Sequence, residues 1–164
     1  MHEAQDAEDD APEVRRAIAK NDSTPTHADL ILARDRDEQA RCLLARKISR
    51  LAPDLNPAQK TRVEELTLEV LDVLARDQMP RVRQIVAEEI KDCGNVPADL
   101  VKLLARDDDL VVCSPILEFS PLLTDDDLIE IIESSPVQGA LSCISRRDHV
   151  ASDVSDAIVA ADDE

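Results

Sequence analysis

The tetrapeptide Leu-Ala-Arg-Asp occurs three times in this chain of 164 residues, and this repetition constrains the fold more than any other feature. The copies are Leu32–Asp35, Leu74–Asp77 and Leu104–Asp107, separated by 42 and then by 30 residues. Apolar residues at helical spacing precede and follow each copy. A unit of this length that recurs between amphipathic helices predicts an array of stacked helical repeats.

The composition favours an all-α fold with an aliphatic core. Gly94 and Gly139 are the only glycines, so the chain lacks the residues that many tight β-turns require. Phe119 is the only aromatic residue, and we expect it to be buried among the leucines, isoleucines and valines of the core.

Apolar periodicity and capping residues predict the positions of the helices. We expect them to start at Pro12, at Pro80, at Pro97 and after Thr124, and to cover residues 37–51, 57–75, 110–119, 137–144 and 152–161. The first of these should bury one face, formed by Val14, Ala17 and Ile18. Pro115 predicts a kink or a late start in the helix over 110–119. Residues 1–11 are expected to form a disordered acidic tail, and residues 12–161 a single repeat domain.

In two of the repeats, the aspartate of the tetrapeptide is followed six residues later by an arginine, in the pairs Asp35–Arg41 and Asp77–Arg83. Asp9 and Arg15 have the same spacing. After Asp107 the sixth residue is Cys113, and Ala140 stands at the corresponding place of the last repeat.

This phrase, Leu-Leu-x-x-Asp followed by Val-Arg, resembles the HEAT repeat over about residues 28–147. The resemblance implies a right-handed α-solenoid of about four HEAT-like helix pairs. It also implies a structural ladder of Asp35, Arg41, Asp77, Arg83 and Asp107, in which each arginine reaches carbonyls and carboxylates of neighbouring turns. The ladder is not expected to continue at Cys113 and Ala140.

The phrases Leu74–Asp77, Val82-Arg83 and Ser120–Leu128 are similar to those of an alphaproteobacterial family known as domain of unknown function 2336. This resemblance covers most of residues 28–160. It implies no activity and no catalytic residue.

The charge argues against nucleic acid and anionic membranes as partners. The chain has 19 basic and 36 acidic residues, a net charge of −17, and residues 94–164 alone carry −12. Such a field repels phosphate groups and attracts basic surfaces. The chain shows no apolar run long enough to cross a bilayer and no secretory leader, so we expect a cytoplasmic protein with reduced thiols.

No motif predicts a catalytic, cofactor or metal site. The histidines are scattered and the four cysteines have no paired spacing, unlike zinc ligands. The triplets Asp107–Asp109 and Asp125–Asp127 suit the start of a helix, since consecutive helical residues point about 100° apart and cannot converge on one atom. We therefore expect a protein without enzymatic activity.

The sequence predicts a protein–protein interaction module, such as a scaffold or adaptor. Arg46, Lys47 and Arg50, together with Arg36, would lie along the helix over 37–51, on the concave side of a solenoid. They could receive an acidic segment of another protein or the acidic end of a second copy. Two alternatives stay open: a small-molecule-binding or lyase-type HEAT-like protein, and a purely structural homo-oligomer.

Overall fold

In the computed structural model, which describes residues 6–52, 62–134 and 136–162, every regular element is a helix. The all-α class predicted from the sequence is confirmed. The main helices are α2 (Pro12–Lys20), α3 (Thr26–Leu32), α4 (Glu38–Leu51), α5 (Arg62–Ala75), α6 (Pro80–Ile90), α7 (Ala98–Ala105), α8 (Leu110–Phe119), α9 (Asp125–Glu133), α10 (Ala140–Ser145) and α11 (Ser152–Asp162).

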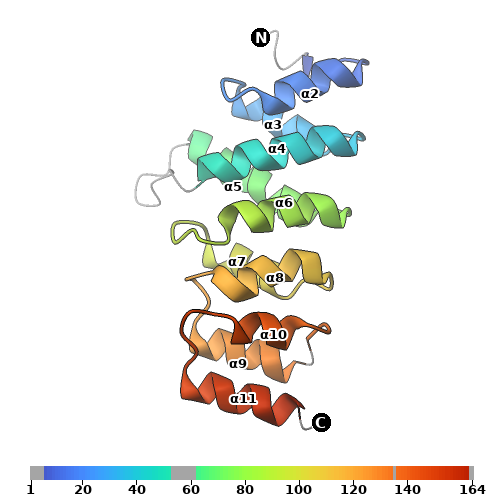
Figure 1. The fold of residues 1–164 in the computed structure, drawn as a ribbon. Helices are drawn as coiled ribbons and strands as arrows, with labels where there is room; N and C mark the ends of the chain where they lie inside the picture. Colours follow the sequence, from blue (N-terminus) through green and yellow to red (C-terminus); the bar gives the residue numbers. More distant parts are fainter. Residues whose placement is uncertain (1–5, 53–61, 135, 163–164) are drawn as a thin grey trace.

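The helices lie in two layers, and Figure 1 shows them running across an elongated stack from the N-terminal to the C-terminal end. In one layer α4 packs on α2, α6 on α4, α8 on α6 and α10 on α8. In the other, α5 packs on α3, α7 on α5 and α11 on α9. The ion pairs Lys102–Asp127 (3.6 Å) and Arg106–Glu130 (3.5 Å) connect α7 to α9. Most close contacts therefore join helices that are two elements apart along the chain and lie in the same layer.

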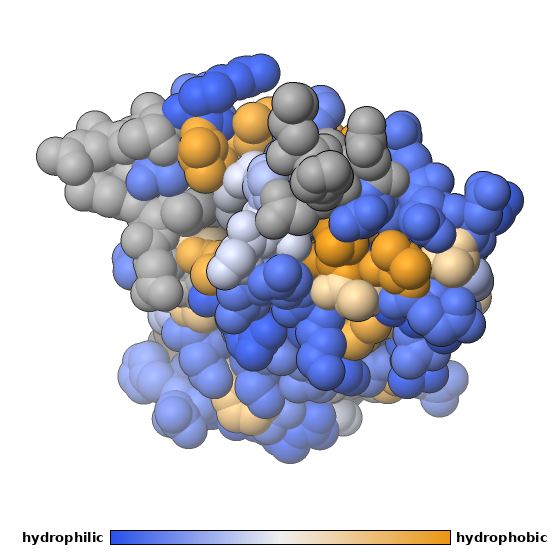
Figure 2. All heavy atoms as spheres, turned by 90° about the horizontal axis from the view of Figure 1, so that it is seen from above, coloured by the Kyte–Doolittle hydropathy of each residue, from blue (hydrophilic) through white to orange (hydrophobic). Residues whose placement is uncertain are grey.

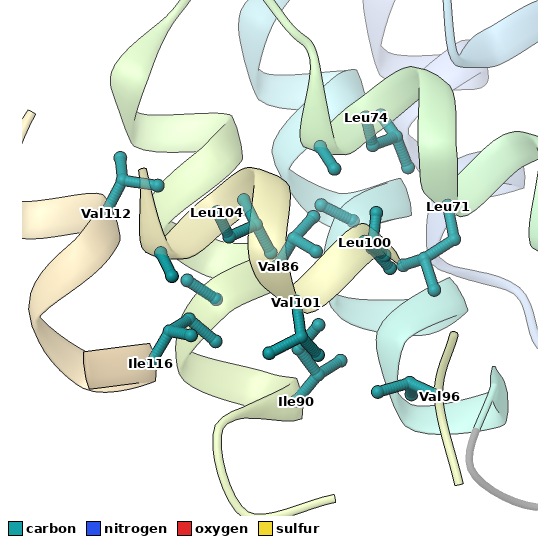
Figure 3. Packing of buried hydrophobic residues seen from close by; sticks show 14 of the residues in the cluster. Leu71, Leu74, Val86, Ile90, Val96, Leu100, Val101, Leu104, Val112 and Ile116 are labelled. Atoms are coloured by element: carbon teal, nitrogen blue, oxygen red, sulfur yellow. The ribbon is translucent and has the colours of Figure 1, made fainter. Parts of the chain in front are cut away.

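The core runs along the boundary between the two layers. Figure 3 shows its middle, where side chains of α5, α6, α7 and α8 meet. Within α6 the buried residues Val82, Val86 and Ile90 are spaced by four, and in α7 Leu100 and Leu104 have the same spacing. Burying aliphatic side chains at this spacing fixes each short helix against its neighbours, because helices of this length are marginal alone.

Helix starts follow the predicted capping chemistry. Pro80 is the first residue of α6, and Pro97 is the N-cap of α7. At α9 the Thr124 side chain accepts from the Asp127 amide, and the Asp127 carboxylate accepts from the Thr124 amide, which is a capping box. The helix expected over 57–75 is seen as α5 from Arg62, since its first part lies outside the described residues.

Two local expectations were wrong, and a third was wrong in part. α8 begins at Leu110 and continues through Pro115, so a late start is excluded, and the alternative of a kink stays a prediction. α10 begins at Ala140 rather than at residue 137, because Gly139 has a left-handed backbone (φ 96°) that cannot continue a helix. α2 buries Arg15 and Ala19, whereas Ala17 is exposed.

Residues 6–11, which belong to the predicted tail, contact the rest of the stack. Ala7 is buried in the core, and the carbonyls of Asp9 and Asp10 accept hydrogen bonds from Arg15 at 2.8 and 3.1 Å. The buried arginine therefore fixes the segment before α2 to the stack. Residues 1–5 lie outside the described part of the chain.

The end of the stack formed by α2 and α3 is partly apolar. Figure 2 looks down on this end and shows hydrophobic side chains among charged ones. Ile18, Leu30 and Ile31 of these helices are only partly buried against the core. Over the residues that the structure covers, no helix combines the length and apolarity needed to span a membrane.

Candidate protein-binding face

One arginine joins two consecutive turns of the stack. Arg41 Nε donates to Asp77 Oδ2 at 2.7 Å, and Nη2 donates to Asp77 Oδ1 at 3.3 Å. Its Nη1 donates to the Asp35 carbonyl at 2.7 Å. Because the guanidinium group is a planar fork of donors, it satisfies a helix-end carbonyl of its own turn and a carboxylate of the next turn at once.

The same arrangement occurs at two more places, and the turns that precede α4, α6 and α8 lie along the right-hand edge in Figure 1. Arg15 binds the Asp35 carboxylate at 2.8 Å and the carbonyl of Asp9, six residues before it. Arg83 binds the Asp107 carboxylate at 2.8 Å and the Asp77 carbonyl at 2.8 Å. We call the three arginines Arg15, Arg41 and Arg83, with Asp35, Asp77 and Asp107, the arginine ladder.

Each ladder carboxylate also organises the start of the next helix. Its Oδ1 atom accepts from the amide two residues further on, at 2.7 Å for Asp35, 2.9 Å for Asp77 and 2.9 Å for Asp107. Each ladder aspartate therefore stabilises its own turn and also accepts hydrogen bonds from the arginine of the preceding turn. The ladder is a structural device, and most of it is buried.

The ladder stops where the sequence lacks arginine. Cys113 is buried, and its thiol donates to the Leu110 carbonyl of its own helix at 3.8 Å. Ala140 is buried as well. Beyond this point, Arg147 follows a different pattern and donates to the carbonyls of Leu117 (2.7 Å) and Ser120 (2.5 Å) at the end of α8.

The four predicted binding cations do not form one patch. Arg36 precedes α4, and Arg50 lies near the end of α4, so about 20 Å of helix separates them. Both are exposed, and Arg50 lies 3.9 Å from Asp22. Arg46 is exposed near the middle of the same helix.

Lys47 was wrongly predicted as a surface residue, since its side chain is only 1% exposed. Its ammonium donates to Asp29 at 2.5 Å and to the Asn21 carbonyl at 3.0 Å, at the end of α2. Burial raises the pKa of the Asp29 carboxyl to about 6, although the hydrogen bond from Lys47 opposes this shift. Lys47 therefore connects α2, α3 and α4 from inside the stack.

Arg46 borders two adjoining hollows along α4 and α6. The larger, of about 630 Å³, lies over α6 between α4 and α8. The smaller, of about 280 Å³, lies between α2, α4 and α6. Arg46 and Arg81 line both. We call this surface the α4–α6 face, defined by Arg46, Arg81, Gln84, Ile85 and Val111.

The α4–α6 face combines positive, negative and apolar groups. Glu88 and Glu89 border the larger hollow beside half-buried Ile85 and exposed Val111. In the smaller hollow Arg16 binds Asp37 at 2.7 Å, and this bond holds the pKa of the Asp37 carboxyl below its ordinary value. Arg46 and Arg81 are the exposed cations that the two hollows share.

Sequence reasoning missed Arg81. It lies directly before the Val82-Arg83 phrase, and that phrase was interpreted only as core and ladder. Consecutive helical residues point about 100° apart, so the buried Val82 requires Arg81 to leave the core. The position of Arg81 directly before a core residue could therefore have predicted that its side chain is exposed.

The expectation that Phe119 is buried was wrong. Its ring is 47% exposed at the end of α8, and the Lys91 ammonium lies 4.7 Å from the ring centroid. The Phe119 side chain is exposed at the last residue of α8, and the Lys91 ammonium makes a cation–π contact with its ring.

The cysteines and the potential metal ligands of the described residues are dispersed. No group of three or more His, Cys, Asp and Glu side chains within the described residues could hold a metal ion. Burial raises the pKa of the Cys42, Cys93 and Cys113 thiols, that of Cys113 to about 11, which disfavours the thiolate form.

Residues 112–164 match a family described as "Uncharacterised protein conserved in bacteria (DUF2336)". The match begins within α8, next to Cys113, and covers about the last third of the chain. Neither a curated protein nor a solved structure shows significant similarity to the chain.

Proposed function

We propose that this chain is a HEAT-like repeat protein, a right-handed α-solenoid of about four helix pairs that serves as a non-enzymatic protein–protein interaction module. Support comes from the two layers of consecutive helices and from the arginine ladder, which repeats one set of bonds at successive turns. An array of this kind offers an extended surface built from many short helices.

The α4–α6 face is the proposed binding surface. The observation that carries this proposal is the pair of adjoining hollows, about 630 and 280 Å³, that share the exposed Arg46 and Arg81. Two guanidinium groups above half-buried Ile85 and exposed Val111 suit a segment with both carboxylates and an aliphatic side chain. The proposed partner is therefore an acidic, partly apolar segment of another protein.

Binding at this face should be modest and sensitive to salt. Trp and Tyr, which dominate tight interfaces, are absent from the chain. Exposed arginine–carboxylate contacts are weak and are screened at physiological ionic strength. These properties suit a reversible adaptor.

Charge reversal on the face tests the proposal. Proteins captured by the tagged wild-type chain would be compared with those captured by Arg46→Glu/Arg81→Glu. The control Arg34→Glu/Arg62→Glu changes the net charge equally at exposed positions outside both hollows. The proposal predicts a set of partners that the wild type and the control capture and the face variant does not. The wild type should capture these partners more strongly when salt is lowered. An unchanged set of partners would contradict it.

A further inference from the structure

We propose that the hollow between the α7–α8 turn and the α9–α10 turn binds the guanidinium group of an arginine side chain from a partner protein. This site is separate from the α4–α6 face and goes beyond the proposed function. The hollow measures about 300 Å³, and its lining includes Asp107, Asp108, Cys113, Ser134 and Val137.

The position of this hollow is the strongest argument. Arg15, Arg41 and Arg83 each place a guanidinium between two successive turns of the stack. At the next turn the equivalent residue is Cys113, whose thiol bonds within its own helix. The hollow lies where the fourth guanidinium of the ladder would stand, and Cys113 forms part of its wall.

The wall residue Asp107 carries one of the two acceptors that each ladder arginine uses, whereas the carboxylate of the following turn has no counterpart among the described wall residues. Each ladder arginine donates to the carbonyl of the residue six positions before it, at 2.7 to 2.8 Å. The equivalent carbonyl here belongs to Asp107, which lines the hollow. A guanidinium entering from solvent can therefore bind the same acceptor as the intramolecular arginines do. The exposed Asp108 carboxylate supplies a second acceptor at the mouth.

The electrostatic environment favours a cation. The carboxyl ends of α7 and α9 border the hollow at Ala105 and Ser134, and the carboxyl end of a helix carries partial negative charge. Among the described lining residues the cation is Arg106, whose guanidinium lies 3.5 Å from Glu130. Burial raises the pKa of the Cys113 thiol to about 11, so this side chain stays uncharged and adds no charge to the hollow.

The hollow is large enough for an arginine side chain. Its volume equals that of roughly ten water molecules and lies at the lower end of the usual range for small-ligand pockets. A planar guanidinium can donate to several turn oxygens in fixed directions, whereas an ammonium acts as a point charge. The site should therefore prefer arginine to lysine.

Titration with N-acetyl-arginine amide, followed through amide chemical shifts, tests the site. We expect saturable shifts confined to the residues around Asp107, Asp108, Cys113 and Val137, with a millimolar dissociation constant. N-acetyl-lysine amide at equal ionic strength should bind at least fivefold more weakly. An arginine-containing tripeptide should bind more tightly than guanidinium ion, since the site takes a side chain presented by a protein. Equal affinity for tripeptide and free ion would overturn that assignment.

Two variants separate binding at the hollow from general attraction to an acidic chain. Cys113→Arg should fill the hollow with its own guanidinium and reduce the response at least tenfold. Asp108→Asn changes an exposed residue, so the fold should persist, and binding should weaken about threefold. If folded Cys113→Arg bound N-acetyl-arginine amide as tightly as the wild type does, the proposal would be overturned. If that variant fails to fold, an unchanged affinity in Asp108→Asn together with equal affinities for the arginine and lysine probes would overturn it.

Discussion

The guanidinium group of Arg41 lies 2.7 Å from the carboxylate of Asp77, a residue 36 positions further along the chain. Both side chains are almost completely buried. Because the same guanidinium also binds the Asp35 carbonyl, it connects the turn before α4 to the turn before α6. The ladder thus fixes the spacing of the helices that form the α4–α6 face.

Removing one ladder arginine should destabilise the chain strongly. Arg41→Ala leaves the buried Asp77 carboxylate without its cation, which typically costs about 3 kcal/mol in the free energy of unfolding. Arg41→Lys should recover only part of this, because an ammonium cannot reproduce the forked hydrogen bonds. Urea denaturation followed by circular dichroism measures the effect.

Arg76→Ala is the matched control for that prediction. Arg76 binds Asp72 at 3.1 Å, but both side chains are more than half exposed, so the loss should be below about 1 kcal/mol. Equal destabilisation by Arg41→Ala and Arg76→Ala would show that the ladder is no more than a set of surface ion pairs.

The buried Asp29 carboxyl should give stability an unusual dependence on pH. Its pKa is raised from 3.8 to about 6, so between these values the folded chain holds a proton that the unfolded chain has released. The contribution of this group to the free energy of unfolding is therefore present at low pH and lost as pH rises through about 6, by up to about 3 kcal/mol. Asp29→Asn, which cannot titrate, should lack this component.

Chemical denaturation of the wild type and Asp29→Asn at pH 4.5 and pH 7 checks the sign. The stability of the wild type relative to the variant should decrease on going to pH 7. An increase would mean that the attraction of Lys47 outweighs the cost of burial and lowers the pKa of the carboxyl.

Gly139→Ala should destabilise the end of the stack. Gly139 has a φ of 96°, and an added Cβ would lie 2.9 Å from Leu110 Cδ2. The left-handed backbone alone costs about 1–2 kcal/mol for an alanine. Gly94→Ala is the control, because nothing lies within 4 Å of its added Cβ. Thermal melts should show a lower midpoint for the first variant and little change for the second.

Alkylation should distinguish the cysteines by position. Cys93 is partly exposed, whereas Cys42, Cys113 and Cys143 are buried. Iodoacetamide at pH 8 should therefore modify Cys93 first, even though its thiol pKa is raised. Mass spectrometry should find Cys113 and Cys143 unmodified until denaturant is added. Rapid modification of Cys113 in the folded chain would contradict its burial.

The sequence predicted features that depend on spacing. The six-residue offset from Asp35 to Arg41 and from Asp77 to Arg83 identified the residues of the ladder, and proline or threonine predicted the starts of α6, α7 and α9. The arginine–carbonyl bonds and the helix starts are local features, because residues within about two helical turns of each other determine them. Arg83 reaches Asp107 through the same repeated geometry.

Which polar side chains lie inside could not be predicted from composition. Arg46 and Lys47 are adjacent, yet Arg46 is exposed beside the two hollows and Lys47 binds Asp29 in the interior. Their roles depend on the angle at which α4 meets α2 and α3, which a single sequence does not specify. Phe119, the last residue of α8, is likewise exposed, although Val112, Ile116 and Leu117 of the same helix are buried.

Site-specific photo-crosslinking in cells tests most directly whether the α4–α6 face binds protein. Benzoylphenylalanine would be placed at Gln84, in the wall of the larger hollow, and separately at Val63, which is 59% exposed on α5 and outside both hollows. The account predicts discrete crosslinked products from position 84 that disappear in the Arg46→Glu/Arg81→Glu background, and none of these products from position 63. The same products from both positions, or products from position 84 that survive the charge reversal, would contradict it.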